Sequence, residues 1–220
     1  MSDRYKEIKQ LFESLDQTGL STREKGRRLE KFVRKYLKTD PQYANKLEDV
    51  WLWEDWPYRW GQDTGIDLVA RDATTGNYWA IQCKFFSPHY KIQKTDIDSF
   101  LAASSRRFTT DEEEMSFSQR IIVSTTPDWG SNAESGIQNQ NPPVIRIDLQ
   151  NFAKSPIDWS EFLWKSPEYL TRYAVKSVMP HQEEAISDVL KGFWDYDRGK
   201  LIMACGTGKI FTALRLSERK

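Results

Sequence analysis

The sequence is poor in cysteine and has no long apolar segment. Its two cysteines, Cys83 and Cys205, are far apart and neither has a CxxC partner, so they give no sign of a disulfide framework or a zinc site. The polar, charged N-terminus does not resemble a signal peptide. No apolar run approaches the roughly 18 residues that span a bilayer. We therefore expect a soluble cytoplasmic protein with no membrane partner.

The chain also lacks a net charge, since 32 Lys and Arg side chains balance 32 Asp and Glu side chains. The total charge gives no reason to expect nucleic acid, and only a local patch can. The most basic stretch is residues 23–38, where Glu24 and Glu30 alone oppose eight basic residues. Such a stretch is either a solvated helix face or a contact for the DNA phosphate backbone.

The order of the expected elements favours an α/β fold. Apolar spacing predicts helices at residues 3–16 and 22–37, and a helix from Thr95 to about Phe108. Short β-branched or apolar runs predict strands at 120–125 and 144–149. Alternating helices and buried strands are typical of α/β proteins. The Trp-rich segment 47–60 is either core or a surface that stacks on bases.

The segment of residues 61–86 brings polar groups to one end of an apolar hairpin. Two strand-like runs, 66–70 and 78–86, flank a polar turn. Strand alternation then places Gln82 and Lys84 on one face and Cys83 on the other, with Asp67 close by. Burying such groups is costly unless they pair or hold a metal.

These residue types suit metal-assisted phosphodiester hydrolysis. Asp67 is the candidate metal ligand, and the Gln82 side-chain oxygen and the Cys83 backbone carbonyl complete the hard-oxygen set that Mg²⁺ prefers. Lys84 is placed to orient the attacking hydroxide and to offset developing negative charge. The alternative is a plain ion pair of Asp67 with Lys84 at a sheet edge. Asp63, just upstream, remains open as a second ligand.

Gly65-Ile66-Asp67-Leu68 followed by Gln82-Cys83-Lys84 resembles the Mrr-like branch of the PD-(D/E)xK nucleases over about residues 20–150. The resemblance implies a restriction-endonuclease-like core, a central mixed β-sheet flanked by helices, and cleavage of double-stranded DNA with Mg²⁺ or Mn²⁺. It also implies that Glu30, which matches the family's upstream acidic residue, joins the site near the metal or water. Without the resemblance, Glu30 would be read as an i, i+4 partner of Arg34.

A second motif, residues 204–209, follows a predicted buried strand at 200–204 and precedes a predicted helix. Backbone N–H groups of such a loop cradle phosphates. Together with Met179-Pro180-His181-Gln182, the motif resembles the opening of a RecA-like helicase motor that binds ATP. The resemblance assigns adenine reading to Gln182 and phosphate binding to Gly206, Thr207, Gly208 and Lys209. Two departures are Met203 in place of glycine and Ile210 in place of the Mg²⁺-binding Ser or Thr.

The order of the two motifs resembles the N-terminus of type ISP (single-polypeptide type I) restriction-modification enzymes. This implies a nuclease domain at 1–150, a linker at 151–175 and a truncated motor at 176–220. It also implies that the rest of the motor, a methyltransferase and a target-recognition domain follow in a full-length chain. A double-strand break would need a second nuclease copy or repeated action. The alternatives are a catalytically inactive DNA-binding or docking domain, and an ATP-binding protein in its own right.

Overall fold

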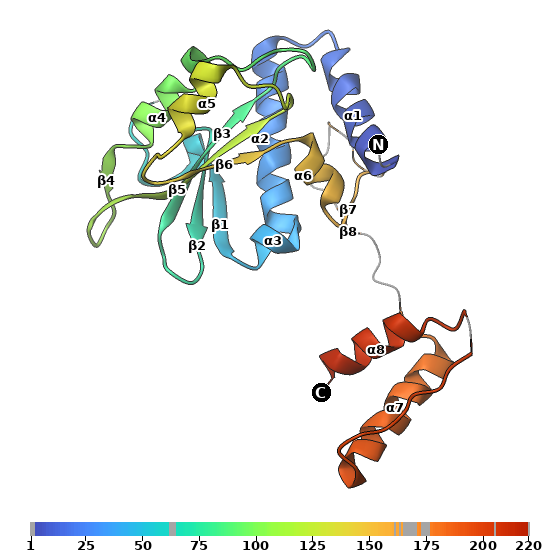
Figure 1. Ribbon diagram of the computed structural model, residues 1–220. Helices are drawn as coiled ribbons and strands as arrows, with labels where there is room; N and C mark the ends of the chain where they lie inside the picture. The colour runs from blue at the N-terminus through green and yellow to red at the C-terminus, as the bar shows by residue number, and fades with distance from the viewer. Residues whose placement is uncertain are drawn as a thin grey trace. The chain divides into compact units, whose positions relative to one another are not determined.

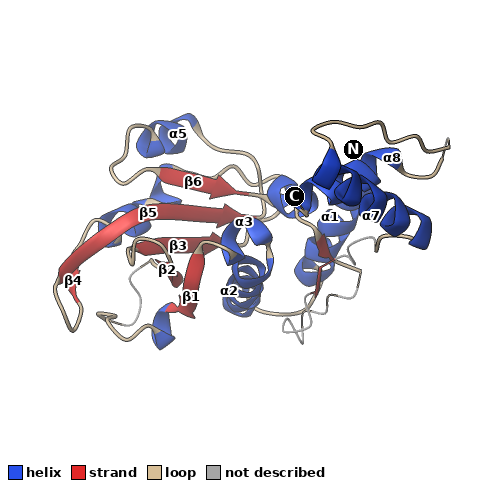
Figure 2. Ribbon diagram, turned by 90° about the horizontal axis from the view of Figure 1, so that it is seen from below, coloured by secondary structure: helices blue, strands red, loops and turns tan. Residues whose placement is uncertain are grey.

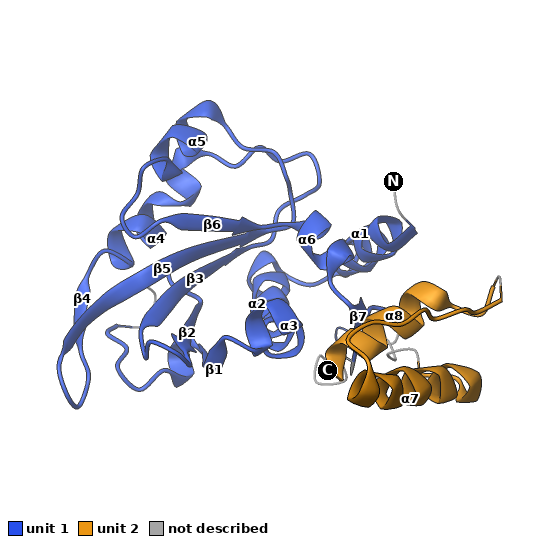
Figure 3. Ribbon diagram, turned by 60° about the horizontal axis from the view of Figure 1, so that its bottom comes forward, with its two compact units in different colours: residues 1–173 blue, residues 174–220 orange. Residues whose placement is uncertain are grey.

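The computed structural model describes residues 3–61, 65–160, 162, 164, 171–172, 177–204 and 206–219. Asp63 and Cys205, on which sequence predictions were made, lie outside the described residues. The chain divides into two compact units, residues 1–173 and residues 174–220 (Figure 3). The assignment of a linker to 151–175 and of a motor to 176–220 remains a prediction.

The centre of the first unit is a mixed β-sheet in which six strands are described (Figure 2). Strand order is β1-β2-β3-β5, and both β4 and β6 pair with β5. The β2 strand pairs antiparallel with both β1 and β3, whereas β5 pairs parallel with both β3 and β6. The α/β class and the central mixed sheet are confirmed. The strands are β1 (Leu47–Leu52), β2 (Leu68–Asp72), β3 (Tyr78–Lys84), β4 (Arg107–Thr109), β5 (Glu114–Ser124) and β6 (Val144–Ile147).

Helices cover both faces of this sheet (Figure 1). The first face is covered by α1 (Asp3–Asp16), α2 (Thr22–Thr39) and α6 (Leu149–Lys154), with the short α3 (Pro41–Ala44) at the end of α2. The second face is covered by α4 (Asp98–Ala103) and α5 (Ser131–Ile137). Strand alternation divides the core accordingly. Leu68, Ile81 and Val123 pack in the cluster with α2, and Val69, Ala80 and Ile122 pack in the cluster with α4.

The α2 helix forms where the sequence predicts it, because its start is capped and one face is apolar. The Ser21 hydroxyl accepts the Glu24 backbone N–H at 3.3 Å, and the Glu24 carboxylate accepts the Ser21 N–H at 2.9 Å. This capping box satisfies two backbone donors that the first helical turn leaves unpaired. Leu29, Phe32 and further apolar side chains of α2 are buried against the sheet. The helix is therefore a fixed support for its opposite, polar face.

Two sequence predictions about elements are wrong. The helix predicted from Thr95 to about Phe108 is the shorter α4, which ends at Ala103, and Phe108 lies in β4, packed edge-on against Trp56 at 4.8 Å between ring centroids. Within the segment predicted as a linker, Phe152, Trp159 and Phe162 are buried against Phe32 of α2. The aromatic contacts of these residues outweigh the polar, Pro- and Ser-rich composition around them. The short strands β7 (Ile157–Asp158) and β8 (Thr171–Arg172), on either side of Trp159 in the sequence, pair with each other.

The second wrong prediction concerns residues 200–204, which form no strand in the described part of the second unit. Ile202 is 89% exposed. That unit consists of two helices, α7 (Pro180–Asp195) and α8 (Lys209–Glu218), and the segments around them. A strand needs a hydrogen-bonded neighbour, and no described residue of the unit supplies one. The RecA-like sheet is thus not visible in this chain.

Two tryptophans of the segment 47–60 belong to the core. Trp53 and Trp56 are buried in the cluster on the α4 face of the sheet, so these two are not part of a base-stacking surface. Among the described helices, none combines the length and the apolar character that crossing a membrane requires.

Candidate active site

Asp67 is held at the start of β2 by backbone hydrogen bonds on two sides. Its N–H donates to the Ile81 carbonyl at 2.9 Å, and its carbonyl accepts the Trp53 N–H at 2.8 Å. Its side chain turns toward β3, where Oδ2 accepts the Cys83 N–H at 2.6 Å. The backbone position of Asp67 is therefore fixed by β3 and by the residue after β1, independently of its carboxylate.

Gln82 and Cys83 take opposite faces of β3, as the sequence predicts. Cys83 belongs to the core cluster on the α2 face, while the Gln82 side chain donates through Nε2 to the Gly65 carbonyl at 3.0 Å. Gly65 has φ +81°, and a Cβ there would lie 2.9 Å from Ser99 Oγ. The left-handed backbone and the close approach of α4 both require glycine at this position. The bond to Gly65 fixes the orientation of the Gln82 amide.

The other amide atom of Gln82, the oxygen Oε1, is buried and has no hydrogen-bond partner. A buried acceptor without a partner costs about 1–3 kcal/mol, so a water molecule or a metal ion bound to this oxygen would stabilise the site. Within the described residues, no group of three or more His, Cys, Asp or Glu side chains is placed to hold a metal ion. A metal site made of the Asp67 carboxylate, the Gln82 amide oxygen and a backbone carbonyl would not need a third side chain of those four types. Oxygen donors of this kind fit Mg²⁺ or Mn²⁺.

Glu30 of α2 and Asp67 line the same cavity, whose volume is about 510 Å³. Glu30 is only 19% exposed, and its carboxylate pairs with Arg27 at 3.1 Å. The pKa of Glu30 is raised above its ordinary value because burial disfavours the charged carboxylate, while the charge of Arg27 opposes that rise. The structure thus brings together two carboxylates that are 37 positions apart in the sequence.

Lys84 ends β3 and is half-buried. The pKa of the buried Cys83 thiol indicates which charges surround it. Burial raises that pKa most, Asp67 and Glu30 raise it further, and Lys84 lowers it. A buried thiol with a raised pKa is a poor nucleophile. The three predicted catalytic side chains that influence it are Asp67, Glu30 and Lys84.

Comparison with known proteins gives two matches that identify the fold and the family. A family model described as a restriction endonuclease, of the Mrr catalytic type, matches residues 38–169. A solved structure of LlaBIII, an ATP-dependent type ISP restriction-modification enzyme bound to DNA, is 35% identical with a TM-score of 0.68. That match covers 94% of this chain. The chain belongs to the restriction endonuclease family.

This restriction endonuclease domain is similar to other members at lower identity. The MspJI restriction endonuclease in complex with a 27-mer oligonucleotide is 18% identical with a TM-score of 0.42, covering 68% of this chain and 30% of that one. The modification-dependent enzyme AspBHI is 13% identical with a TM-score of 0.38, covering 68% of this chain and 33% of that one. A comparison with curated proteins gave no match. The present chain spans 13% of the LlaBIII chain.

Sequence reasoning missed the ion pairs around the candidate site. Glu30 pairs with Arg27 and not with Arg34, which instead contacts Asp55 at 3.6 Å. The acidic partners come from residues 49–55, which α2 packs against, and no helical periodicity could indicate them. The available sequence signal was the acidic pair Glu54-Asp55, which lies in the turn that follows β1. The cavity lining is Arg23, Glu24, Arg27, Glu30, Trp53, Glu54, Ile66 and Asp67.

These ion pairs also reduce the number of basic side chains in residues 23–38 that are available for a phosphate contact. Arg27, Arg34 and Lys38 are matched by Glu54, Asp55 and Asp49, and Lys25 is matched by Asp16. In the described part of the chain, the basic residues of this stretch without an ion pair are Arg23, Arg28, Lys31 and Lys35. A phosphate contact by this helix would fall mainly to those four side chains.

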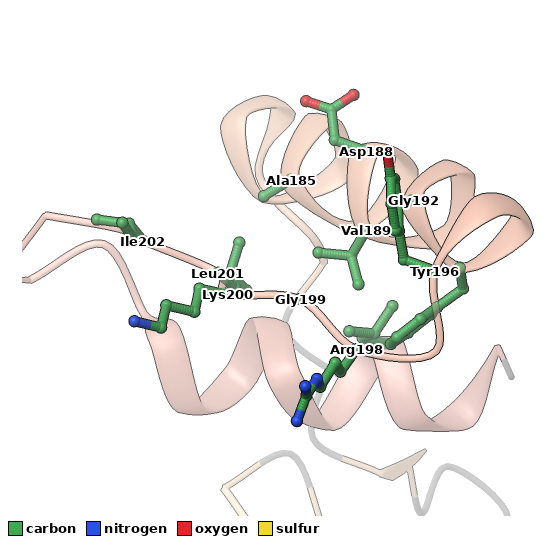
Figure 4. Close-up of a pocket in the computed structure, with 12 residues that line it drawn as sticks. Ala185, Asp188, Val189, Gly192, Tyr196, Arg198, Gly199, Lys200, Leu201 and Ile202 are labelled. Atoms are coloured by element: carbon green, nitrogen blue, oxygen red, sulfur yellow. The ribbon is translucent and has the colours of Figure 1, made fainter.

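The second unit contains the other predicted binding residues. Gln182 is buried, and its Nε2 donates to the Thr207 carbonyl at 2.8 Å. Gly206 and Gly208 have φ +81° and +79°, and Lys209 donates to the Met203 carbonyl at 3.1 Å. A cavity of about 630 Å³ lies in this unit between α7 and residues 198–202, with Ala185 and Val189 of α7 among its lining (Figure 4). No residue of the loop 206–209 lines it, so it is separate from the predicted phosphate site.

Glu30→Gln should make the stability of the metal-free protein less dependent on pH. Because the pKa of Glu30 is raised on folding, the native state holds a proton that the unfolded state loses above about 4.5. The free energy of unfolding then falls as pH rises from that value through the raised pKa. We expect urea titrations at a series of pH values to show that the wild type loses stability, relative to Glu30→Gln, as pH rises through this range.

Glu24→Gln is the matched control for that measurement. The pKa of Glu24 is lowered, chiefly by its hydrogen bond to the Ser21 side chain. Ionised Glu24 therefore contributes stability that is present above about 4.5 and is lost as pH falls, the opposite sense to Glu30. An identical slope in Glu30→Gln and the wild type would contradict a raised pKa at Glu30.

Proposed function

We propose that residues 1–173 form a metal-dependent DNA endonuclease module that hydrolyses a phosphodiester. The observation that carries this proposal is the buried, unpartnered Oε1 of Gln82 in the hairpin of Asp67, with Glu30 and Asp67 in one cavity. Membership of the restriction endonuclease family supports it independently. In this proposal Asp67, Gln82 Oε1 and the Cys83 carbonyl would hold Mg²⁺ or Mn²⁺.

The bound ion would acidify a water molecule and act as a Lewis acid toward the phosphate. The chain's own residues set the geometry around it. The Gly65 bond orients the Gln82 amide, and the backbone bonds of Asp67 hold its carboxylate at the end of β3. Glu30, kept near the site by Arg27, would orient a water or accept its proton. Lys84 would supply positive charge as negative charge develops on the phosphate.

We further propose that this module is the cutting part of an ATP-dependent type ISP restriction-modification enzyme acting on double-stranded DNA. The LlaBIII match supports this, since it extends over 94% of the present chain and therefore into the second unit. In that unit Gln182, Gly206, Thr207, Gly208 and Lys209 would belong to the ATP site. Ile210 is 89% exposed and has no hydroxyl for Mg²⁺. ATP hydrolysis, a second nuclease copy and downstream domains belong to the proposal for the whole enzyme.

The deciding experiment is plasmid nicking by residues 1–220 with Mg²⁺ or Mn²⁺ and with EDTA. We expect nicking that requires the metal and is removed by the chelator, because the carboxylates and Gln82 have no catalytic power of their own toward a phosphodiester. Duplex binding without nicking in either metal would contradict the proposal and favour the inactive DNA-binding or docking domain. Nicking that persists in EDTA would contradict metal dependence.

A further inference from the structure

Arg27 occupies a position within the cavity that the assigned catalytic roles do not explain. Its guanidinium contacts two carboxylates at once, Glu30 through Nη1 at 3.1 Å and Glu54 through Nη2. Arg27 lies one turn before Glu30 on α2, whereas Glu54 lies in the 3₁₀ turn that follows β1. The guanidinium therefore connects two elements across the wall that Asp67 also lines.

The charge of this cavity opposes the entry of DNA. Its lining has four acidic side chains, Glu24, Glu30, Glu54 and Asp67, and two basic ones, Arg23 and Arg27. A phosphodiester is an anion and is repelled by an excess of carboxylates at close range. A divalent ion would cancel the net excess of two negative charges that Arg23 and Arg27 leave, which makes the cavity neutral but not attractive to an anion. Attraction of the phosphate therefore requires a protein cation that contacts the carboxylates in the free protein and the incoming phosphate in the complex.

Arg27 meets this requirement better than Arg23 does. No ion pair in the described part of the chain holds Arg23, so its charge is available whether or not DNA is present. Arg27 is held by the carboxylates of the site itself. When Glu30 turns to its water or metal role, the Nη1 bond of Arg27 is released. A guanidinium presents a planar fork of N–H donors that fits a phosphate with two parallel bonds.

We propose that Arg27 exchanges partners during the reaction. In the free protein it bridges Glu30 and Glu54, and in the DNA complex it binds a backbone phosphate of the cleaved strand, so that Glu54 acts as the competing partner. This inference rests on the proposed function, since it takes the cavity as the nuclease site. Arg27 is a positioning residue for the phosphate, and Glu54 holds it in place until DNA enters.

The test is a double-mutant cycle on duplex affinity, measured by fluorescence anisotropy in EDTA at one salt concentration. Glu54→Gln should bind a labelled duplex about threefold to fivefold more tightly, because it frees Arg27 from an exposed ion pair. Arg27→Ala should bind about tenfold more weakly, having lost a charged phosphate contact. The double variant should bind like Arg27→Ala, because without the guanidinium there is nothing for Glu54 to hold.

Glu114→Gln is the matched control, because Glu114 pairs with Arg107 at 3.0 Å in a comparably exposed ion pair on the β4–β5 hairpin. It removes the same charge away from the cavity and should leave duplex affinity unchanged. If Glu54→Gln gains the same affinity with and without Arg27, plain loss of a negative charge explains the gain and partner exchange is overturned. Unchanged affinity in both Glu54→Gln and Arg27→Ala overturns it as well.

Arg27→Lys supplies a second measurement, which depends on the planar arrangement of the guanidinium N–H donors and not on the positive charge. We expect near wild-type duplex affinity but about tenfold slower nicking, because an ammonium is a point charge that cannot make two parallel bonds. Wild-type nicking by Arg27→Lys would overturn the positioning role. If the wild type fails to nick with metal, the proposed function fails, while the affinity cycle still reports on Arg27. The two failures are therefore distinguishable.

Discussion

We expect Lys84→Ala to lose plasmid nicking by about a thousandfold while it remains folded and still binds duplex DNA. The loss is of the size measured when a preorganised group that stabilises developing anionic charge is removed. Folding survives because the contacts that fix this position are backbone contacts. Lys84 pairs with Ser124 of β5, and its carbonyl accepts the Thr125 N–H at 3.2 Å, which alanine retains. The half-buried side chain leaves no sealed cavity when it is shortened.

The measurement for Lys84 is the initial nicking rate with Mg²⁺ or Mn²⁺, beside urea unfolding and duplex affinity. Lys94→Ala is the matched control, since Lys94 is exposed, pairs with Asp98 at 2.6 Å and does not line the cavity of Glu30 and Asp67. We expect Lys94→Ala to nick at the wild-type rate. A fully active Lys84→Ala protein would remove Lys84 from the site. Loss of both folding and nicking would show that the lysine has a structural role.

Asp67→Asn should abolish nicking and also weaken Mn²⁺ binding, which Lys84→Ala should leave intact. The amide oxygen of asparagine can still accept the Cys83 N–H, so unfolding should change by only about 1 kcal/mol. A neutral oxygen is a far weaker ligand for a divalent ion than a carboxylate. We therefore expect at least about a tenfold loss of Mn²⁺ affinity, measured by calorimetry on the protein without DNA.

Asp72→Asn is a close control at the other end of the same hairpin. Its carboxylate also accepts backbone N–H groups, from Thr74 and Thr75 at 2.9 Å each. The chemical change and the type of hydrogen bond are thus the same, and only the location differs. Asp72→Asn should keep wild-type nicking and Mn²⁺ affinity. Equal Mn²⁺ binding by Asp67→Asn and the wild type would contradict Asp67 as the metal ligand.

The elements that the sequence predicts well are those with a strong local signal. Ser21 with Glu24 marks the start of α2, and the alternation in 78–84 places Gln82 and Cys83 on opposite faces. The wrong predictions depended on distant partners. Phe108 lies in a strand because it packs against Trp56 and Phe117. Both residues are too far from Phe108 in the sequence for a helical pattern to indicate them.

The residues of the candidate site also differ in whether a local sequence pattern indicates them. Asp67, Gln82 and Lys84 come from one hairpin, whose register follows from its own sequence. Glu30 entered only through a family resemblance, because its proximity to Asp67 depends on how α2 packs on the sheet. Glu54 and Arg27 were missed since an ion pair across 27 positions has no periodic signature. Whether the predicted residues are catalytic stays a prediction for the variants above.

The backbone anchoring of Asp67 has a consequence for how members of this family diverge. The bonds to Trp53 and Ile81 use main-chain atoms only, so they tolerate many residues at position 67. A descendant could lose its carboxylate and keep its hairpin, its sheet and its surface for DNA. Selection for stability would hardly oppose a change to asparagine, which still accepts the Cys83 N–H. Relatives of this nuclease that have lost activity should therefore be recognisable by the side chain at position 67 and not by any change of fold.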